Sequence, residues 1–69
     1  MFGLTKRQQE LYDFLLACEK KKHTPSYREM AKHMGLKSVG NISVILASMK
    51  RRGAVDYLSG QARSVRVIK

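Results

Sequence analysis

The chain has 69 residues and a net charge of +9, and 43% of its residues are apolar while 28% are charged. A chain this short buries only about 60% of its unfolded surface, so we expect one domain with one small core over residues 1–69. Its single cysteine excludes a disulfide framework, and its apolar runs are too short to span a membrane.

The positive charge is concentrated in the second part of the chain. Four of the five acidic residues precede Met30, whereas eight basic residues and only Asp56 follow it. A strongly basic surface attracts a polyanion, either nucleic acid or an acidic membrane surface. We therefore expect the partner to meet the residues after Met30.

The sequence has no pattern typical of catalysis or metal binding. Its two histidines and one cysteine lack the spacing of zinc ligands, and no glycine-rich phosphate loop is present. The first residues lack the apolar core of a signal peptide, which favours a cytoplasmic protein. We expect no enzyme activity, cofactor, small-molecule ligand or membrane partner.

The first helix is predicted to begin at Thr5 and to run to about Lys22. Thr5 and Gln8 have the spacing of a capping box, in which each side chain binds the backbone N–H of the other residue. Apolar residues then recur at helical spacing, and Cys18 continues their stripe as a small buried hydrophobe. The stripe consists of Leu11, Phe14, Leu15 and Cys18.

A second helix of about eight residues is predicted after a turn at residues 23–25. Ser26 and Glu29 form another capping box, and Gly35 stands where a left-handed residue ends the helix. A helix this short requires packing against its neighbours. Its apolar face consists of Met30, Ala31 and Met34.

The third helix is predicted to begin at Ser38, and it carries no charge before Lys50. Its core stripe consists of Ile42, Ile45, Leu46 and Met49. Its other face consists of Gly40, Asn41, Ser43, Val44, Ala47 and Ser48. A solvated face in so charged a chain would carry Lys and Glu, which favours a surface for a partner over a fully buried helix.

The two helices joined at Gly35 form a helix-turn-helix pattern. In this motif the second helix enters the DNA major groove, while flanking basic groups contact phosphates. Lys37 precedes the neutral face and residues 50–52 follow it, which fits that arrangement. Protein-binding domains use the same fold, so the pattern alone does not establish DNA binding.

After Gly53 the apolar period changes from 3.6 to 2, which predicts a two-stranded hairpin with a turn at residues 59–62. The expected fold is mainly α with a small β-hairpin, a winged helix-turn-helix of three helices and a two-stranded antiparallel wing. Arg63 is expected at the wing tip, where it reaches a phosphate or the minor groove. The hairpin should pack on the first and third helices.

Three segments, LTKRQQELYDFL, TPSYREMAKHMGLKS and KRRGAVDYLSGQARSVRVI, resemble in order and spacing the N-terminal DNA-binding domain of the LexA repressors. The resemblance covers nearly the whole chain. It implies a winged helix that binds an operator as a transcriptional repressor. Gly40, Ser43 and Val44 stand where that family commonly has an Asn and two Glu, so the operator need not be the family's.

The pattern and the resemblance together give two sets of candidate residues. Base-reading residues are expected to be Ser38, Gly40, Asn41, Ser43 and Val44. Val44 is a candidate for contact with a thymine methyl group. Phosphate-contacting residues are expected to be Ser26, Tyr27, Arg28, Lys37, Lys50, Arg51, Arg52 and Arg63.

The chain ends where the wing ends, so we expect neither the self-cleaving domain of the LexA repressors nor the dimerisation that it provides. The free chain should be a monomer, and a second copy should join it on DNA at an inverted repeat. Two alternatives stay open. One is an excisionase-like architectural protein that bends DNA, and the other is a winged-helix module that binds another regulator.

Overall fold

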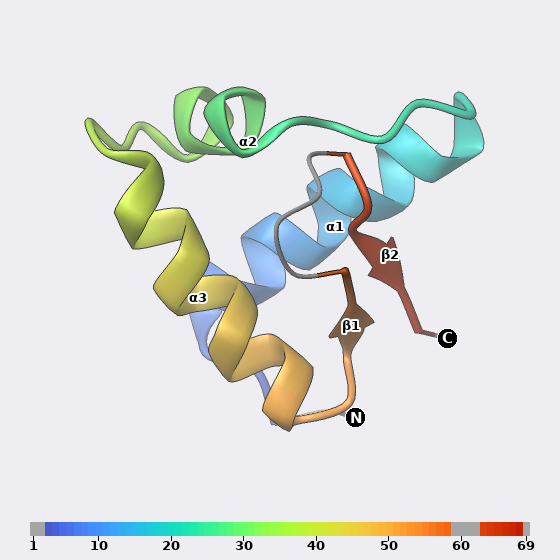
Figure 1. Cartoon of the computed structure of the whole chain (residues 1–69). Coiled ribbons are helices and arrows are strands. Elements are labelled where there is room, and N and C mark those ends of the chain that lie inside the picture. The colour runs from blue at the N-terminus through green and yellow to red at the C-terminus, as the bar shows by residue number, and fades with distance from the viewer. Residues whose placement is uncertain (1–2, 59–62, 69) are drawn as a thin grey trace.

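The computed structural model describes residues 3–58 and 63–68, which form three helices and a two-stranded sheet. In chain order these are α1 (Lys6–Lys20), α2 (Tyr27–Met34), α3 (Val39–Arg51), β1 (Val55–Asp56) and β2 (Arg66–Val67). Figure 1 shows α1 behind the other elements, with α2 above it, α3 on one side and the sheet on the other. The predicted winged helix-turn-helix fold is confirmed.

The capping box predicted at the start of α1 is present. The Thr5 hydroxyl accepts a hydrogen bond from the Gln8 backbone N–H at 3.2 Å, and the Gln8 side chain accepts one from the Thr5 N–H at 3.1 Å. The helix ends at Lys20, slightly before the predicted end at Lys22. Lys22 has a φ of +56°, and a right-handed helix cannot continue through that conformation.

The structure also confirms both predicted ends of α2. Ser26 and Glu29 form the capping box, with a bond of 3.1 Å to the hydroxyl and one of 2.8 Å to the carboxylate. Gly35 ends the helix in the left-handed region with a φ of +70°, where a side chain would be strained. The chain then turns directly into α3, so that α2 and α3 pack together as a helix-turn-helix.

All three helices and the hairpin contribute to one hydrophobic core. The predicted α3 stripe faces this core, since Ile42, Leu46 and Met49 are fully buried, while Ile45 is half-buried. Cys18 is buried as predicted, and this burial raises the pKa of its thiol. The buried apolar residues of the core are Leu11, Tyr12, Leu15, Met30, Ala31, Met34, Ile42, Leu46, Met49, Ala54, Val55 and Val65.

The hairpin packs against the core beside α1 and α3. Its strands pair antiparallel, with Val55 opposite Val67. As predicted, the hairpin packs on the first and third helices, with β2 beside α1 and β1 beside α3. Tyr12 of α1 donates a hydrogen bond of 3.0 Å to the backbone oxygen of Ile68. The predicted turn at residues 59–62 lies outside the described residues.

Candidate nucleic-acid interface

The first half of α3 presents the residues that the sequence assigned to base reading. The Ser38 hydroxyl caps the helix by accepting a hydrogen bond from the Gly40 N–H at 3.1 Å, which leaves the hydroxyl proton available to another acceptor. The structure places all five of these residues on the solvent-exposed side: Ser38, Gly40, Asn41, Ser43 and Val44.

The second half of this face differs from the prediction. Ala47 and Ser48 are half-buried, and the Ser48 hydroxyl accepts a hydrogen bond of 2.9 Å from the Gln8 side chain. Gln8 is a buried polar residue that serves the α1 capping box and the α1–α3 contact at the same time. Sequence reasoning missed the second role, because capping-box spacing reveals only the local bond.

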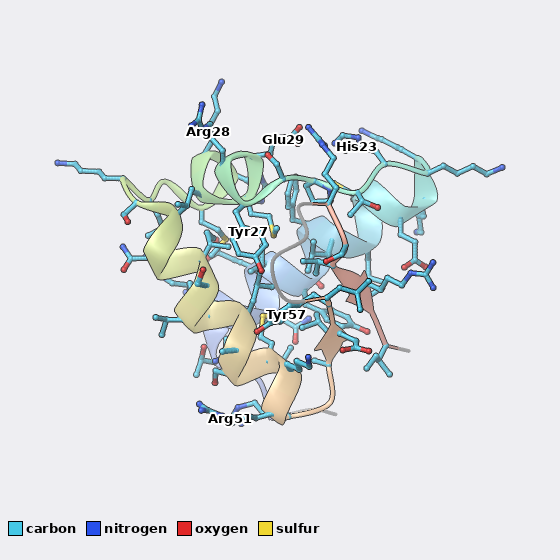
Figure 2. The ribbon with its side chains drawn as sticks, in the orientation of Figure 1. His23, Tyr27, Arg28, Glu29, Arg51 and Tyr57 are labelled. Carbon is cyan, nitrogen blue, oxygen red and sulfur yellow. The ribbon has the colours of Figure 1, made fainter. Side chains whose placement is uncertain are left out.

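The predicted phosphate-contacting residues fall into two groups. Arg28, Lys37 and Arg51 are exposed, and no ion pair involves them within residues 3–58 and 63–68. Figure 2 shows Arg28 extending away from α2 and Arg51 extending away from the C-terminal end of α3. These two guanidinium groups therefore stand at opposite ends of the helix-turn-helix and are open to an anion.

The second group makes contacts inside the protein. The Lys50 ammonium lies 3.4 Å from the Asp56 carboxylate and 4.6 Å from the centre of the Tyr57 ring, and it donates to the Tyr57 backbone oxygen. Arg52 donates to the backbone oxygen of Gly3. These two residues tie the end of α3 to β1 and to the N-terminal segment, and their phosphate contacts stay a prediction.

Glu29 joins the start of α2 to the wing. Its Oε1 accepts a hydrogen bond of 2.8 Å from the Ser26 N–H and forms an ion pair with the Arg63 guanidinium, whose Nη1 lies 2.8 Å away. Its Oε2 lies 3.3 Å from Nε2 of His23. Arg63 also donates to the Thr24 backbone oxygen at 2.9 Å, so the residue expected to contact phosphate is held on Glu29 in the free protein.

This arrangement changes the acidity of Glu29. The backbone N–H of Ser26 is the main cause that lowers the pKa of its carboxyl group from 4.5 to about 2, with further contributions from the Ser26 hydroxyl, Arg63 and His23. The carboxylate is thus ionised at neutral pH. It cancels part of the positive charge of Arg63.

Tyr27 follows Ser26 in the first turn of α2 and is half-buried. Burial raises the pKa of its hydroxyl, and the neighbouring Tyr57 raises it further. The hydroxyl therefore keeps its proton at neutral pH and is able to donate a hydrogen bond to a phosphate oxygen. The Ser26 hydroxyl accepts the capping bond from the Glu29 N–H.

This surface combines a neutral helix face with exposed basic groups. Among the residues that the structure describes, no three His, Cys, Asp or Glu side chains form a group able to hold a metal ion. In the same part of the chain, every helix is too short or too polar to cross a membrane. A neutral helix face between exposed basic groups is an arrangement that fits the grooves and phosphates of a nucleic acid.

Comparison with known protein families gives an independent result. Residues 1–64 match the family model of the LexA DNA binding domain. The chain is 36% identical over 69 residues to the transcription regulator LexA of a Synechocystis species, which covers 99% of this chain and 34% of that protein.

Two further relatives are LexA repressors. The one from Koribacter versatilis is 33% identical over 70 residues and matches 100% of this chain and 33% of its own length. The one from Pasteurella multocida is 33% identical over 67 residues, which cover 96% of this chain and 32% of that protein. The chain thus spans about a third of the length of the relatives that it matches.

The low pKa of Glu29 makes the stability of the protein depend on pH. Because this pKa is lower in the folded than in the unfolded chain, the stabilising effect of the carboxylate is complete above about pH 4.5 and is lost as the pH falls toward 2. Glu29→Gln keeps a capping side chain but removes this titration. Denaturant unfolding of the variant between pH 2 and 6 should therefore show a smaller loss of stability than the wild type.

Glu10→Gln is the matched control for this measurement. Glu10 is exposed on α1, and no ion pair includes it in the described part of the chain. The control should follow the wild-type curve. Parallel curves for the wild type and Glu29→Gln would contradict the role assigned to this carboxylate.

Proposed function

The chain belongs to the LexA DNA binding domain family, and on this basis we propose that it binds specific sequences of double-stranded DNA as a transcriptional repressor. The observation that supports the proposal most strongly concerns α3. The first half of this helix is exposed and uncharged, while basic residues stand before the helix and in its last turn. The proposed role is regulatory and non-catalytic. A regulator of this kind acts on the chromosome, so a cytoplasmic, nucleoid-associated location forms part of the proposal.

The proposed complex has α3 in the major groove, with its N-terminal half toward the base edges. Ser38, Asn41 and Ser43 supply donors and acceptors there, and Gly40 allows close approach of the backbone. Residues around the helix contact the DNA backbone on both sides of the groove. We assign this role to Ser26, Tyr27, Arg28, Lys37, Lys50, Arg51, Arg52 and Arg63.

The exposed and internally bonded residues of this set should act differently. Arg28, Lys37 and Arg51 are ready to meet phosphates without breaking an ion pair. Lys50 and Arg63 must first exchange Asp56 and Glu29 for a phosphate. Such an exchange costs part of the energy that the new contact supplies, so the first group should contribute more to affinity.

One domain of this size, which we take to span residues 1–69, reads only a few base pairs. A single helix with about three base contacts discriminates weakly against the many competing sites in a genome. We therefore propose that two copies bind an inverted repeat whose half-sites lie about one helical turn apart. Contact between the copies would form on the DNA.

The function is tested by selecting preferred duplexes from a random pool and measuring affinity for the selected and for unrelated sequences. A preference of at least about a thousandfold is typical of specific regulators. Equal affinity for all duplexes would contradict sequence-specific repression. Strong bending of DNA without sequence preference would indicate an architectural protein instead.

Asn41 is proposed to read adenine through N6 and N7. Asn41→Ala should weaken binding to the selected duplex by about 1–3 kcal/mol and leave binding to a random duplex nearly unchanged. Alanine favours a helix more than asparagine does, so the melting temperature should not fall. Equal losses on both duplexes would show that Asn41 does not read a base.

Arg51 is proposed to contact a phosphate. Arg51→Ala should weaken binding to all sequences alike and reduce the slope of log affinity against log salt by about one, because one phosphate contact releases roughly one counterion. Lys20→Ala is the control, since it removes one exposed charge at the far end of α1. The control should keep the wild-type slope, and an unchanged slope for Arg51→Ala would exclude the contact.

The assembly on DNA is tested with one half-site and with the complete inverted repeat. The affinity per half-site should be higher on the repeat, whereas light scattering of the free chain at micromolar concentration should give the mass of a monomer. Identical affinities per half-site would exclude cooperative pairing. A dimer in the absence of DNA would show an interface other than the proposed one.

A further inference from the structure

We propose that Val44 recognises the C5-methyl group of a pyrimidine in the major groove and thereby determines part of the sequence specificity. The inference rests on the proposed function, since it requires that α3 enter that groove. It adds the chemistry of the base that this helix position selects.

Val44 is unusual in its exposure. It is 70% exposed, which is the highest value among the large hydrophobic residues in the described part of the chain. A β-branched residue also disfavours a helix, so neither burial nor helix propensity explains a valine at this position. Single exposed apolar residues are common on protein surfaces, but one on a face that enters a groove offers its methyl groups to whatever covers that face.

The neighbours of Val44 make its methyl groups prominent. Residues four before and three after lie on the same side of a helix, and here they are Gly40 and Ala47. Neither has a side chain longer than a methyl group. The Val44 methyl groups therefore stand beside small neighbours on this side of α3, and the exposed Asn41 side chain lies three residues before them.

The charges around this surface favour DNA as the partner that covers it. No acidic residue occurs between Glu29 and Asp56, whereas Lys37 precedes α3 and three basic residues follow Met49. An apolar side chain between exposed cations matches a groove in which base edges lie between two phosphate backbones. These positive charges would repel a basic protein surface and would not attract a neutral one.

The chemistry of the base edges identifies the group that valine recognises. Most major-groove positions present hydrogen-bond donors or acceptors, and a valine over them would remove water without replacing its hydrogen bonds. The C5-methyl group of thymine is the apolar exception. A 5-methylcytosine carries the same methyl group, so both pyrimidines are possible sources of this contact.

The experiment is a double-mutant cycle on the selected duplex. Each thymine of the site is replaced in turn by uracil, which pairs identically but lacks the methyl group, and affinity is measured for the wild type and for Val44→Ala. The wild type should lose about fourfold at one position, which corresponds to the burial of one methyl group. Val44→Ala should bind the thymine and uracil duplexes equally at that position.

A second arm distinguishes the two sources of the methyl group. Cytosine and 5-methylcytosine are placed at the same position, paired with guanine. If the methyl group alone is recognised, methylation should increase wild-type affinity about fourfold and leave Val44→Ala unchanged. If recognition also requires the other groups of thymine, methylation of the cytosine should have no effect. The contact is then assigned to thymine alone.

Ile68→Ala is the matched control, because Ile68 is an exposed apolar residue at 41% exposure and lies outside α3. It should keep the wild-type difference between thymine and uracil. Val44→Ala should not lower the melting temperature, since alanine favours the helix, so a loss of discrimination cannot come from unfolding.

Two results would overturn the inference. One is a uracil penalty of equal size in the wild type and in Val44→Ala, and the other is the absence of a penalty at every thymine of the selected site. Both leave the proposed function intact, because the chain would still prefer that duplex. A failure to select any preferred duplex would instead remove the proposed function and this inference together.

Discussion

The burial of one face of α3 is the constraint on which the rest of this structure depends. Ile42, Leu46 and Met49 are fully buried, and each such side chain contributes about 1.5–3 kcal/mol when it leaves water. A chain of 69 residues builds only one small core, so the loss of this face would remove a large part of it. The helix is therefore fixed by its inner face, and its outer face can carry residues that add nothing to stability.

Polar contacts then fix the orientation of the helix and of the wing. The Gln8–Ser48 hydrogen bond joins α1 to α3, and the contacts of Lys50 with Asp56 and Tyr57 join α3 to β1. Each of these contacts is individually weak where solvent reaches it. Together they restrict how the wing lies beside the helix, and in the proposed complex this geometry decides which parts of a DNA duplex the two elements reach at once.

The basic residues of this protein serve two purposes that net charge alone does not separate. Arg28 and Arg51 extend from the helix-turn-helix into solvent, whereas Arg63 is held on Glu29. Long-range attraction of a polyanion depends on all of them, since it follows the summed charge. Close contacts depend on which basic side chains make no ion pair. Glu29, at the start of α2, already pairs with Arg63.

The sequence by itself determined the local features of this fold. Both capping boxes, the left-handed Gly35 and the apolar stripes follow from residues within one or two helical turns, and the hairpin from a change of period. Only the tertiary structure decided the contacts of Gln8 with Ser48 and of Arg63 with Thr24. The first pair is separated by 40 positions in the sequence and the second by 39. Capping and periodicity act between near neighbours, so they contain no information about which distant polar group a side chain meets once the helices pack.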